Sequence, residues 1–153
     1  QVDIMALIES LQTDYQEMGN TVEIDGVIGH PYFGGPLALR RCLTNLVDNA
    51  VRYGRRATIV LEDAADQITI RILDEGPGIP EEDLERAFEP FFRGEQSRNR
   101  ETGGTGLGLG IARNIARAHG GELQLKNRAG GGLEAMLCQP LPRKALARSP
   151  GNL

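Results

Sequence analysis

The sequence predicts an α+β two-layer sandwich, with about three helices on one face of a mixed sheet of about five strands. Segments with helical and with strand periodicity are interspersed along the chain, which places both kinds of element in one unit. Two pairs of strand-like segments are close enough in sequence to form hairpins, and hairpins require antiparallel pairing. A chain of 153 residues is large enough to bury one core without disulfides or metal.

The first half of the chain predicts a helix, a strand and a second helix. Apolar residues at the spacing of one helix face predict a helix from about Val2 to Met18. Alternating apolar and acidic residues predict a strand from Thr21 to Ile28. The second helix should begin near Pro36, since proline suits a first helical turn, run through Tyr53 and stop at Gly54.

The second half predicts two hairpins separated by helices. Its expected elements are strands at Ala57 to Leu61 and Gln67 to Leu73, a short helix around Pro80 to Ala87, a helix from about Gly106 to His119, and strands at Glu122 to Lys126 and Leu133 to Gln139. Residues 1–142 are thus expected to form one domain. Residues 143–153 lack periodicity, carry Pro and Gly, and predict a flexible C-terminal tail or linker.

Composition excludes several classes of protein. A formal net charge of −4 argues against a general nucleic-acid surface, which would need excess Lys and Arg. Cys42 and Cys138 stand apart within apolar runs, so we expect buried, reduced thiols and a cytoplasmic setting. No apolar run approaches the ~18 residues that span a bilayer, and the N-terminus does not resemble a signal peptide.

The segment Gly103 to Gly110, GGTGLGLG, is rich in glycine and directly precedes a helical pattern. Glycines let the backbone approach a ligand closely, and the helix start offers free N–H groups to an anion, so the segment predicts a phosphate site. A flexible surface loop is the alternative. The segment has no Gly-Lys-Ser/Thr ending, which excludes a Walker loop, and its G-x-G-x-G run follows a polar stretch rather than a buried strand, which excludes a dinucleotide fingerprint.

The stretch from Gly94 to Gly104, which runs into the start of the glycine-rich segment, is polar and without period. It predicts a lid over the bound ligand. Since its residues offer little apolar surface to bury, we expect nucleotide to order it.

The second predicted helix has one polar face, formed by Asn45, Asn49 and Arg52, opposite an apolar face. Asparagine is a poor helix former, so two asparagines one turn apart favour a binding role, although a solvated polar face is the simpler alternative. An amide oxygen is a suitable ligand for Mg²⁺ that is held together with substrate phosphates.

Two further motifs follow the strand that ends near Leu73. Asp74 begins the run DEGPGI, where a carboxylate can accept a hydrogen bond from an exocyclic amine, and a simple tight turn is compatible with that role. The run FEPFFR, from Phe88 to Arg93, holds three of the four phenylalanines. Such a cluster is typical of a core, whereas Arg93 beside it can reach a phosphate.

With these motifs in this order, the chain resembles the catalytic ATP-binding domain of bacterial sensor histidine kinases, in the superfamily shared with gyrase B, the Hsp90 chaperones and the MutL proteins. NLVDNAVRYG resembles the asparagine box, DEGPGI the first glycine box, FEPFFRG the phenylalanine box and GGTGLGLGI the second glycine box. The resemblance covers about Val2 to Leu141 and is closest in wording to the osmosensor-type branch. It implies the Bergerat-type ATP-binding fold, with ATP and Mg²⁺ as cofactors.

The resemblance also implies a role for each matching residue. Asn49 would ligate the Mg²⁺ of bound ATP with Asn45 nearby, and Arg52 and Tyr53 would contact the phosphates and nucleoside. The remaining implied contacts are Asp74 to the adenine amine, Gly76, Gly78 and Ile79 along the base, Arg93 toward the phosphates, and Gly104, Thr105, Gly106, Leu107, Gly108 and Leu109 in the lid and helix start. Gly110 departs from the family pattern and is expected to loosen the helix start.

The implied reaction is phosphoryl transfer to a histidine, with Asn45 and Arg93 as the catalytic residues. ATP-hydrolysing branches of the superfamily resemble one another in carrying a glutamate where this chain has Asn45, and an amide cannot take a proton from water. Neither His30 nor His119 has the context of a phosphoacceptor, and we expect capping or dipole roles for them. The expected partners are the protein's own dimerisation and phosphotransfer hairpin and a response regulator, not nucleic acid.

We therefore expect a fragment of a longer protein, a cytoplasmic domain that is monomeric in isolation and belongs to an inner-membrane sensor. The alternative is a nucleotide-gated interaction module that binds ATP without transferring phosphate.

Overall fold

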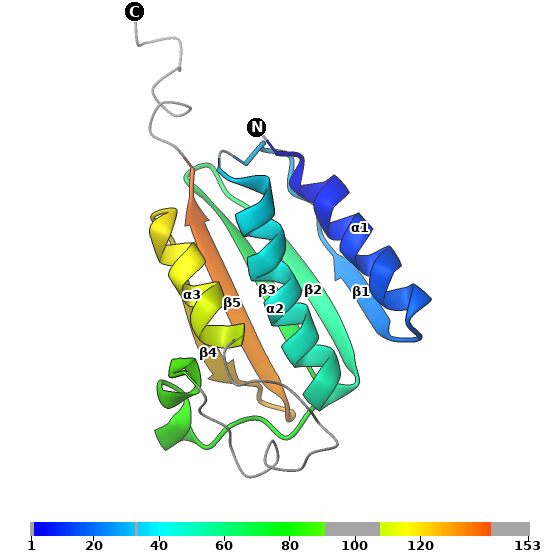
Figure 1. The fold of residues 1–153 in the computed structure, drawn as a ribbon, viewed down its shortest axis with the longest axis vertical. Coiled ribbons are helices and arrows are strands. Elements are labelled where there is room, and N and C mark those ends of the chain that lie inside the picture. Colours follow the sequence, from blue (N-terminus) through cyan, green and yellow to red (C-terminus); the bar gives the residue numbers. More distant parts are fainter. Residues whose placement is uncertain (1, 33, 91–107, 142–153) are drawn as a thin grey trace, which may run out of the picture.

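The computed structural model describes residues 2–32, 34–90 and 108–141, which form two layers (Figure 1). One layer is a five-stranded mixed sheet in the order β1-β2-β3-β5-β4. Its strands are β1 (Thr21–Asp25), β2 (Arg56–Asp63), β3 (Gln67–Asp74), β4 (Glu122–Asn127) and β5 (Leu133–Pro140). The first two strands are parallel, and the other neighbouring pairs are antiparallel, including both predicted hairpins. The predicted fold class is confirmed.

Within the described residues, the helices α1 (Ile4–Glu17), α2 (Pro36–Gly54) and α3 (Gly108–Ala118) lie on one face of this sheet (Figure 1). Proline opens α2, as the sequence predicts. Asp3, which the sequence analysis did not single out, caps α1 by accepting a hydrogen bond from the Ala6 N–H at 3.1 Å. Strand β1 is shorter than predicted, because the chain leaves the sheet edge after Asp25.

The predicted short helix around Pro80 to Ala87 is wrong. Two 3₁₀ turns take its place, η1 (Glu81–Asp83) and η2 (Arg86–Phe88). The backbone N–H groups here donate three residues back rather than four, as from Asp83 to the Pro80 carbonyl at 2.8 Å and from Glu89 to the Arg86 carbonyl at 2.9 Å, which is the tighter 3₁₀ pattern. The segment instead turns tightly enough to bury Ala87 and Phe88.

The core lies between the two layers and is aliphatic. Leu43, Leu46 and Val47 on α2 are at most 1% exposed, and they face an isoleucine-rich β3. Full burial of each such side chain stabilises the fold by about 1.5–3 kcal/mol. The apolar face predicted for α2 is therefore confirmed. It directs the opposite, polar face of the helix away from the sheet.

The opposite face of the sheet carries no helix among the described residues. Arg71 on β3 lies there between Glu62 and Glu134, with its Nη2 atom 2.9 Å from Glu62 Oε1. Within the three described ranges, no helix is both long and apolar enough to cross a membrane.

The two cysteines are free thiols in different environments. Cys42 is buried and lies 3.5 Å from the Ala112 carbonyl oxygen, and burial raises the pKa of its thiol to about 12. The prediction of buried thiols is confirmed for Cys42 and wrong for Cys138, which is only half-buried. The reason is strand alternation, because Cys138 shares the helix-free face of β5 with Met136 and pairs with Thr69.

Candidate functional site

Asp74 ends β3 and is the buried carboxylate of the candidate site, with 4% of its surface exposed. Its Oδ1 atom accepts hydrogen bonds from the Gly76 N–H at 2.9 Å and the Leu133 N–H at 3.1 Å. Burial raises the pKa of Asp74, and the two N–H donors oppose that shift. Among the described residues no donor is bonded to Oδ2. The carboxylate is thus fixed through Oδ1, while Oδ2 accepts no hydrogen bond from the described residues.

The loop after Asp74 lies directly on the C-terminal end of α2. A Cβ atom added to Gly54 would lie 2.6 Å from the Asp74 Cβ, and one added to Gly76 would lie 2.6 Å from the Tyr53 carbonyl oxygen. Both distances are shorter than any real contact, so each side of this junction requires glycine. Gly54 therefore ends the helix, as the sequence predicts, and also admits the loop.

The turn between β4 and β5 holds the same loop from the other side. The Asn127 side chain pairs with Ile79, since its Oδ1 accepts from the Ile79 N–H at 2.9 Å and its Nδ2 donates to the Ile79 carbonyl at 2.6 Å. Arg128 Nη1 donates to the Asp74 carbonyl at 2.6 Å. Sequence reasoning missed these residues and treated the run from Asn127 to Gly132 only as a hairpin connection. The available signal was its three consecutive glycines, residues 130–132.

The polar face of α2 carries the predicted Asn45, Asn49 and Arg52, of which both asparagines are half-buried and Arg52 is exposed. Asn45 Nδ2 donates to the Gly108 carbonyl at 3.3 Å, which ties α2 to the first residue of α3. The Asn49 amide has no hydrogen-bond partner within the described ranges. Its side-chain oxygen therefore has no competing partner there, and an amide oxygen is a suitable metal ligand for Mg²⁺.

Asp48 lies on the same helix but is directed to α1 rather than to the site. The Tyr15 hydroxyl donates to its Oδ1 atom at 2.5 Å, and burial together with this bond raises the pKa of Tyr15 above its ordinary value. Since Asn49 is the next residue along α2, this contact ties the site-bearing stretch of the helix to α1.

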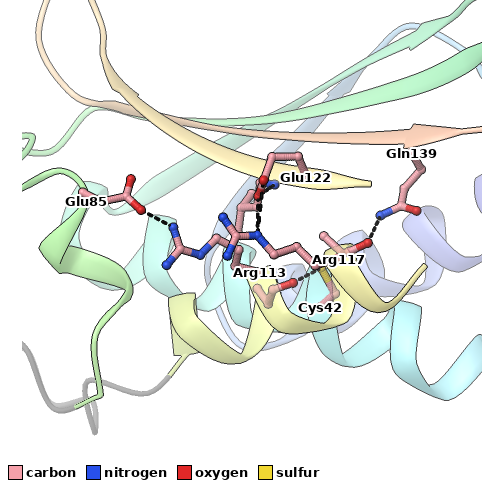
Figure 2. A network of polar contacts seen from close by, with 9 residues as sticks. Cys42, Glu85, Arg113, Arg117, Glu122 and Gln139 are labelled. Carbon is pink, nitrogen blue, oxygen red and sulfur yellow. Dashed lines mark hydrogen bonds and ion pairs between the residues drawn. The ribbon is translucent and has the colours of Figure 1, made fainter. Parts of the chain in front are cut away.

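The N-terminal half of α3 is anchored on η2 and on Glu85 just before it, and Figure 2 shows the contact between Arg113 and Glu85. Arg113 lies over the Phe88 ring, 3.8 Å from its centroid, and its Nη1 atom is 2.5 Å from Glu85 Oε1. A Cβ atom on Gly110 would lie 2.4 Å from the Phe88 carbonyl oxygen. This contact explains why glycine stands at position 110, because any side chain there would prevent η2 from packing against α3.

Further along α3, Figure 2 shows two contacts with the strands at that edge of the sheet. Arg117 pairs with Glu122 on β4 at 3.0 Å, and Gln139 on β5 donates to the Ala116 carbonyl at 3.3 Å. The helix that follows the glycine-rich segment is therefore held at both of its ends.

Several predicted site residues lie outside the described residues. These are Arg93, Gly104, Thr105, Gly106 and Leu107, together with the predicted lid from Gly94 to Gly104. Their roles remain predictions. Gly108 and Leu109 are described and open α3 beside Asn45, while Gly78 and Ile79 lie in the loop that Asn127 holds.

The two histidines have structural partners. The His119 ring follows α3 and its Nδ1 atom lies 2.9 Å from the Ile115 carbonyl, which is the capping role expected for it. His30 Nδ1 lies 2.6 Å from Asp63 Oδ1, and this partner with nearby backbone donors lowers the pKa of Asp63 against the opposing effect of burial. His30 thus ties the segment before α2 to the end of β2, rather than capping a helix.

The fold is a two-layer domain in which α2, the loop after β3 and the start of α3 lie together and form the candidate site. A family model described as histidine kinase-, DNA gyrase B- and HSP90-like ATPase matches residues 34–143. The chain belongs to this family, and within it to the catalytic ATP-binding domains of histidine kinases.

Individual relatives agree with this assignment. The chain is 48% identical over 145 residues to the sensor histidine kinase GtrS of Pseudomonas aeruginosa, covering 95% of this chain and 29% of GtrS. The mycobacterial sensor histidine kinase MprB superposes with a TM-score of 0.77 at 28% identity, covering 91% of this chain and 96% of that structure. Full-length ShkA, solved in complex with AMPPNP, gives 0.69 at 26% identity, covering 91% and 30%. The chain thus spans under a third of the length of GtrS.

Proposed function

We propose that this domain binds Mg²⁺-ATP and donates the γ-phosphate to a histidine on a separate dimerisation hairpin of the same protein, in two-component signalling. The observation that carries the proposal is Asp74, a buried carboxylate with one oxygen fixed by two backbone donors and the other without a donor among the described residues. Such a group is expensive to bury, and a ligand amine offsets the cost.

Asp74 suits adenine in particular. The exocyclic amine of adenine is a donor, whereas guanine presents a carbonyl oxygen at the equivalent position. An ionised carboxylate accepts a hydrogen bond from the adenine amine and repels the guanine carbonyl oxygen. The close contact of the loop with Tyr53 and Gly54 leaves the Asp74 carboxylate at a junction that only glycine backbone allows. This arrangement supports Gly76, Gly78 and Ile79 as the residues that pass along the base.

The polar face of α2 suits the phosphate end. We assign Asn49 as the protein ligand of Mg²⁺, and Arg52, an exposed cation one turn further on, as a phosphate contact, with Tyr53 at the nucleoside. Mg²⁺ when bound would neutralise charge on the phosphates. The proposal extends to Arg93 as a phosphate contact and to the segment from Gly104 to Leu109 as the phosphate cradle.

Asn45 decides the fate of the γ-phosphate. Its amide donates to the Gly108 carbonyl and cannot act as a base toward water near neutral pH. The site therefore retains the phosphoryl group for an acceptor nucleophile. In the transfer, the bond from γ-phosphorus to the bridging oxygen of ADP breaks as a bond to an imidazole nitrogen forms.

The proposal has consequences for the whole protein. It assigns residues 1–142 to the catalytic domain and residues 143–153 to a C-terminal tail. It includes a cytoplasmic location as part of an inner-membrane sensor, a response regulator as the next phosphate acceptor, and a monomeric state for the isolated domain.

The test has two stages. Calorimetry of the 153-residue chain should detect binding of ATP or ADP with Mg²⁺, and Asn49→Ala should remove the dependence on the metal. Labelled γ-phosphate should then move to a supplied dimerisation hairpin and not to the hairpin whose histidine is replaced by alanine.

The two stages fail in different ways. Absence of nucleotide binding at millimolar concentration would refute the proposed function entirely. Binding without transfer to the hairpin would refute the transfer step and favour a nucleotide-gated interaction module.

A further inference from the structure

The Asn127 side chain supplies the hydrogen bonds of the backbone at the end of the first glycine box. It accepts from the Ile79 N–H at 2.9 Å, donates to the Ile79 carbonyl at 2.6 Å and also donates to Glu81 Oε1 at 3.3 Å. Ile79 makes no other backbone hydrogen bond with the described residues. The Asn127 amide thus satisfies both backbone groups of Ile79, as a neighbouring strand would in a sheet.

Arg128, the next residue, holds the beginning of the same loop. Its guanidinium donates to the Asp74 carbonyl at 2.6 Å, and its own N–H donates to the Gly132 carbonyl at 2.9 Å, which closes the turn. The Leu133 N–H at the far side of the turn donates to Asp74 Oδ1 at 3.1 Å. The β4–β5 turn therefore contacts both ends of the loop from 74 to 79.

Both supports of this loop pack closely against it, and only one of them adds several directed hydrogen bonds. Helix α2 packs on the loop at Gly54 and Tyr53, and the β4–β5 turn packs on it at Gly132. The hydrogen bonds from Asn127 and Arg128 in addition fix the orientation of the loop. Orientation is the property on which recognition of a base edge by one carboxylate oxygen depends.

We propose that Asn127 and Arg128 are positioning residues for adenine recognition, which act by holding Asp74 and the backbone of residues 76–79 in register with the base. The inference rests on the proposed function, because it assigns the determinants of base selectivity within that nucleotide site. Neither residue needs to touch the ligand. Their replacement should therefore alter the adenine end of the site and leave the metal end intact.

The experiment compares Asn127→Ala with the parent 153-residue chain. Calorimetry measures the dissociation constants of ATP and GTP with Mg²⁺, and of ATP in EDTA. We expect the ATP constant to rise about 5- to 50-fold, because the Ile79 backbone groups lose their partners and the loop moves. The preference for ATP over GTP should fall, while the ratio between the Mg²⁺ and EDTA constants should not change.

Two further variants complete the design. Arg128→Gln removes the charged donor to the Asp74 carbonyl and should change the same preference in the same direction by a smaller factor. Lys126→Ala is the matched control, because Lys126 precedes Asn127 on β4 and is exposed. The control should bind both nucleotides as the parent does. Circular dichroism melting confirms that each variant is folded at the temperature of the titrations.

The outcomes separate the inference from the function it rests on. If the parent chain does not bind ATP, the proposed function fails. If the parent binds and both variants retain its affinity and its preference for ATP over GTP, the inference fails while the function stands. An equal loss for ATP and GTP would also overturn it, as that is the mark of a merely structural role. If Asn127→Ala does not fold, the Arg128→Gln comparison decides.

Discussion

Replacing Gly132 by alanine tests whether the β4–β5 turn determines the position of Asp74. Gly132 has φ +102°, and a Cβ atom there would lie 2.0 Å from the Asp74 carbonyl oxygen. The neighbouring Gly131 has φ +105°, with no atom within 4 Å of its Cβ position. Alanine would therefore strain the backbone similarly at both positions, but only at position 132 would its Cβ atom clash with Asp74. Gly131→Ala is the matched control.

The magnitudes follow from these two contributions. A side chain at such a positive φ costs about 1–2 kcal/mol, which both variants pay in unfolding free energy. In Gly132→Ala the backbone must also shift by about 1 Å, at a cost of about 1–3 kcal/mol for overpacking. The shift weakens the Leu133 hydrogen bond to Asp74, which adds about 1 kcal/mol. We expect Gly132→Ala to be the less stable variant by about 2–4 kcal/mol.

Urea unfolding and ATP titration provide the assays. The difference between the variants should appear as a lower urea midpoint at unchanged slope, and as a melting temperature lower by about 5–12 °C. Gly132→Ala should also bind ATP more weakly, whereas Gly131→Ala should bind it as the parent does. Equal stability of the two variants would refute the argument, because strain alone would then explain both.

Three further outcomes test the site. Gly110→Ala should destabilise the domain despite a gain of about 1 kcal/mol in helix propensity, because the new methyl group would clash with the Phe88 carbonyl oxygen. Gly108→Ala is the control, because its methyl group would make only ordinary van der Waals contacts and should not destabilise the domain. Thermal melting compares the two variants. Burial raises the pKa of Asp74, so the ionised carboxylate opposes folding. The contribution of Asp74 to the free energy of unfolding is therefore most favourable below the ordinary pKa of about 4 and is lost as the pH rises through the raised pKa toward 7. Asp74→Asn should thus be as stable as the parent or more so at pH 7, with the difference shrinking toward pH 4, yet lose preference for ATP over GTP; lower stability in urea at pH 7 would contradict this. Asn45→Glu should add measurable ATP hydrolysis, as a general base contributes about 10²–10⁴-fold, and rapid hydrolysis by the unmodified chain would count against the assignment.

Local signals in the sequence predicted most of the fold. Proline and glycine marked both ends of α2, and the apolar period marked the face that packs on the sheet. The two hairpins followed from short connections between strand-like runs. The single short helix before Phe88 was wrong, because two 3₁₀ turns form there and the burial of Ala87 and Phe88 that accompanies them depends on tertiary packing.

The candidate site was predictable only where its residues lie within one motif. Asn45, Asn49 and Asp74 each belong to a contiguous pattern with its own chemistry. Asn127 was missed because its role depends on contacts with Ile79, 48 residues away in sequence. No periodicity or spacing reports that the β4–β5 turn lies against the loop after β3. Such information is tertiary and appears only once the sheet order is known.

The order of the strands has a consequence for how the protein is made. β5 is the last strand in the sequence, yet it lies between β3 and β4 in the sheet. Until β5 emerges from the ribosome, β4 has no hydrogen-bonded neighbour in the sheet and Asp74 lacks its Leu133 donor. At about 5–20 residues per second, the interval between the two strands is short. Synthesis from the N-terminus therefore leaves the sheet and the support of the loop after Asp74 incomplete until β5 has been made.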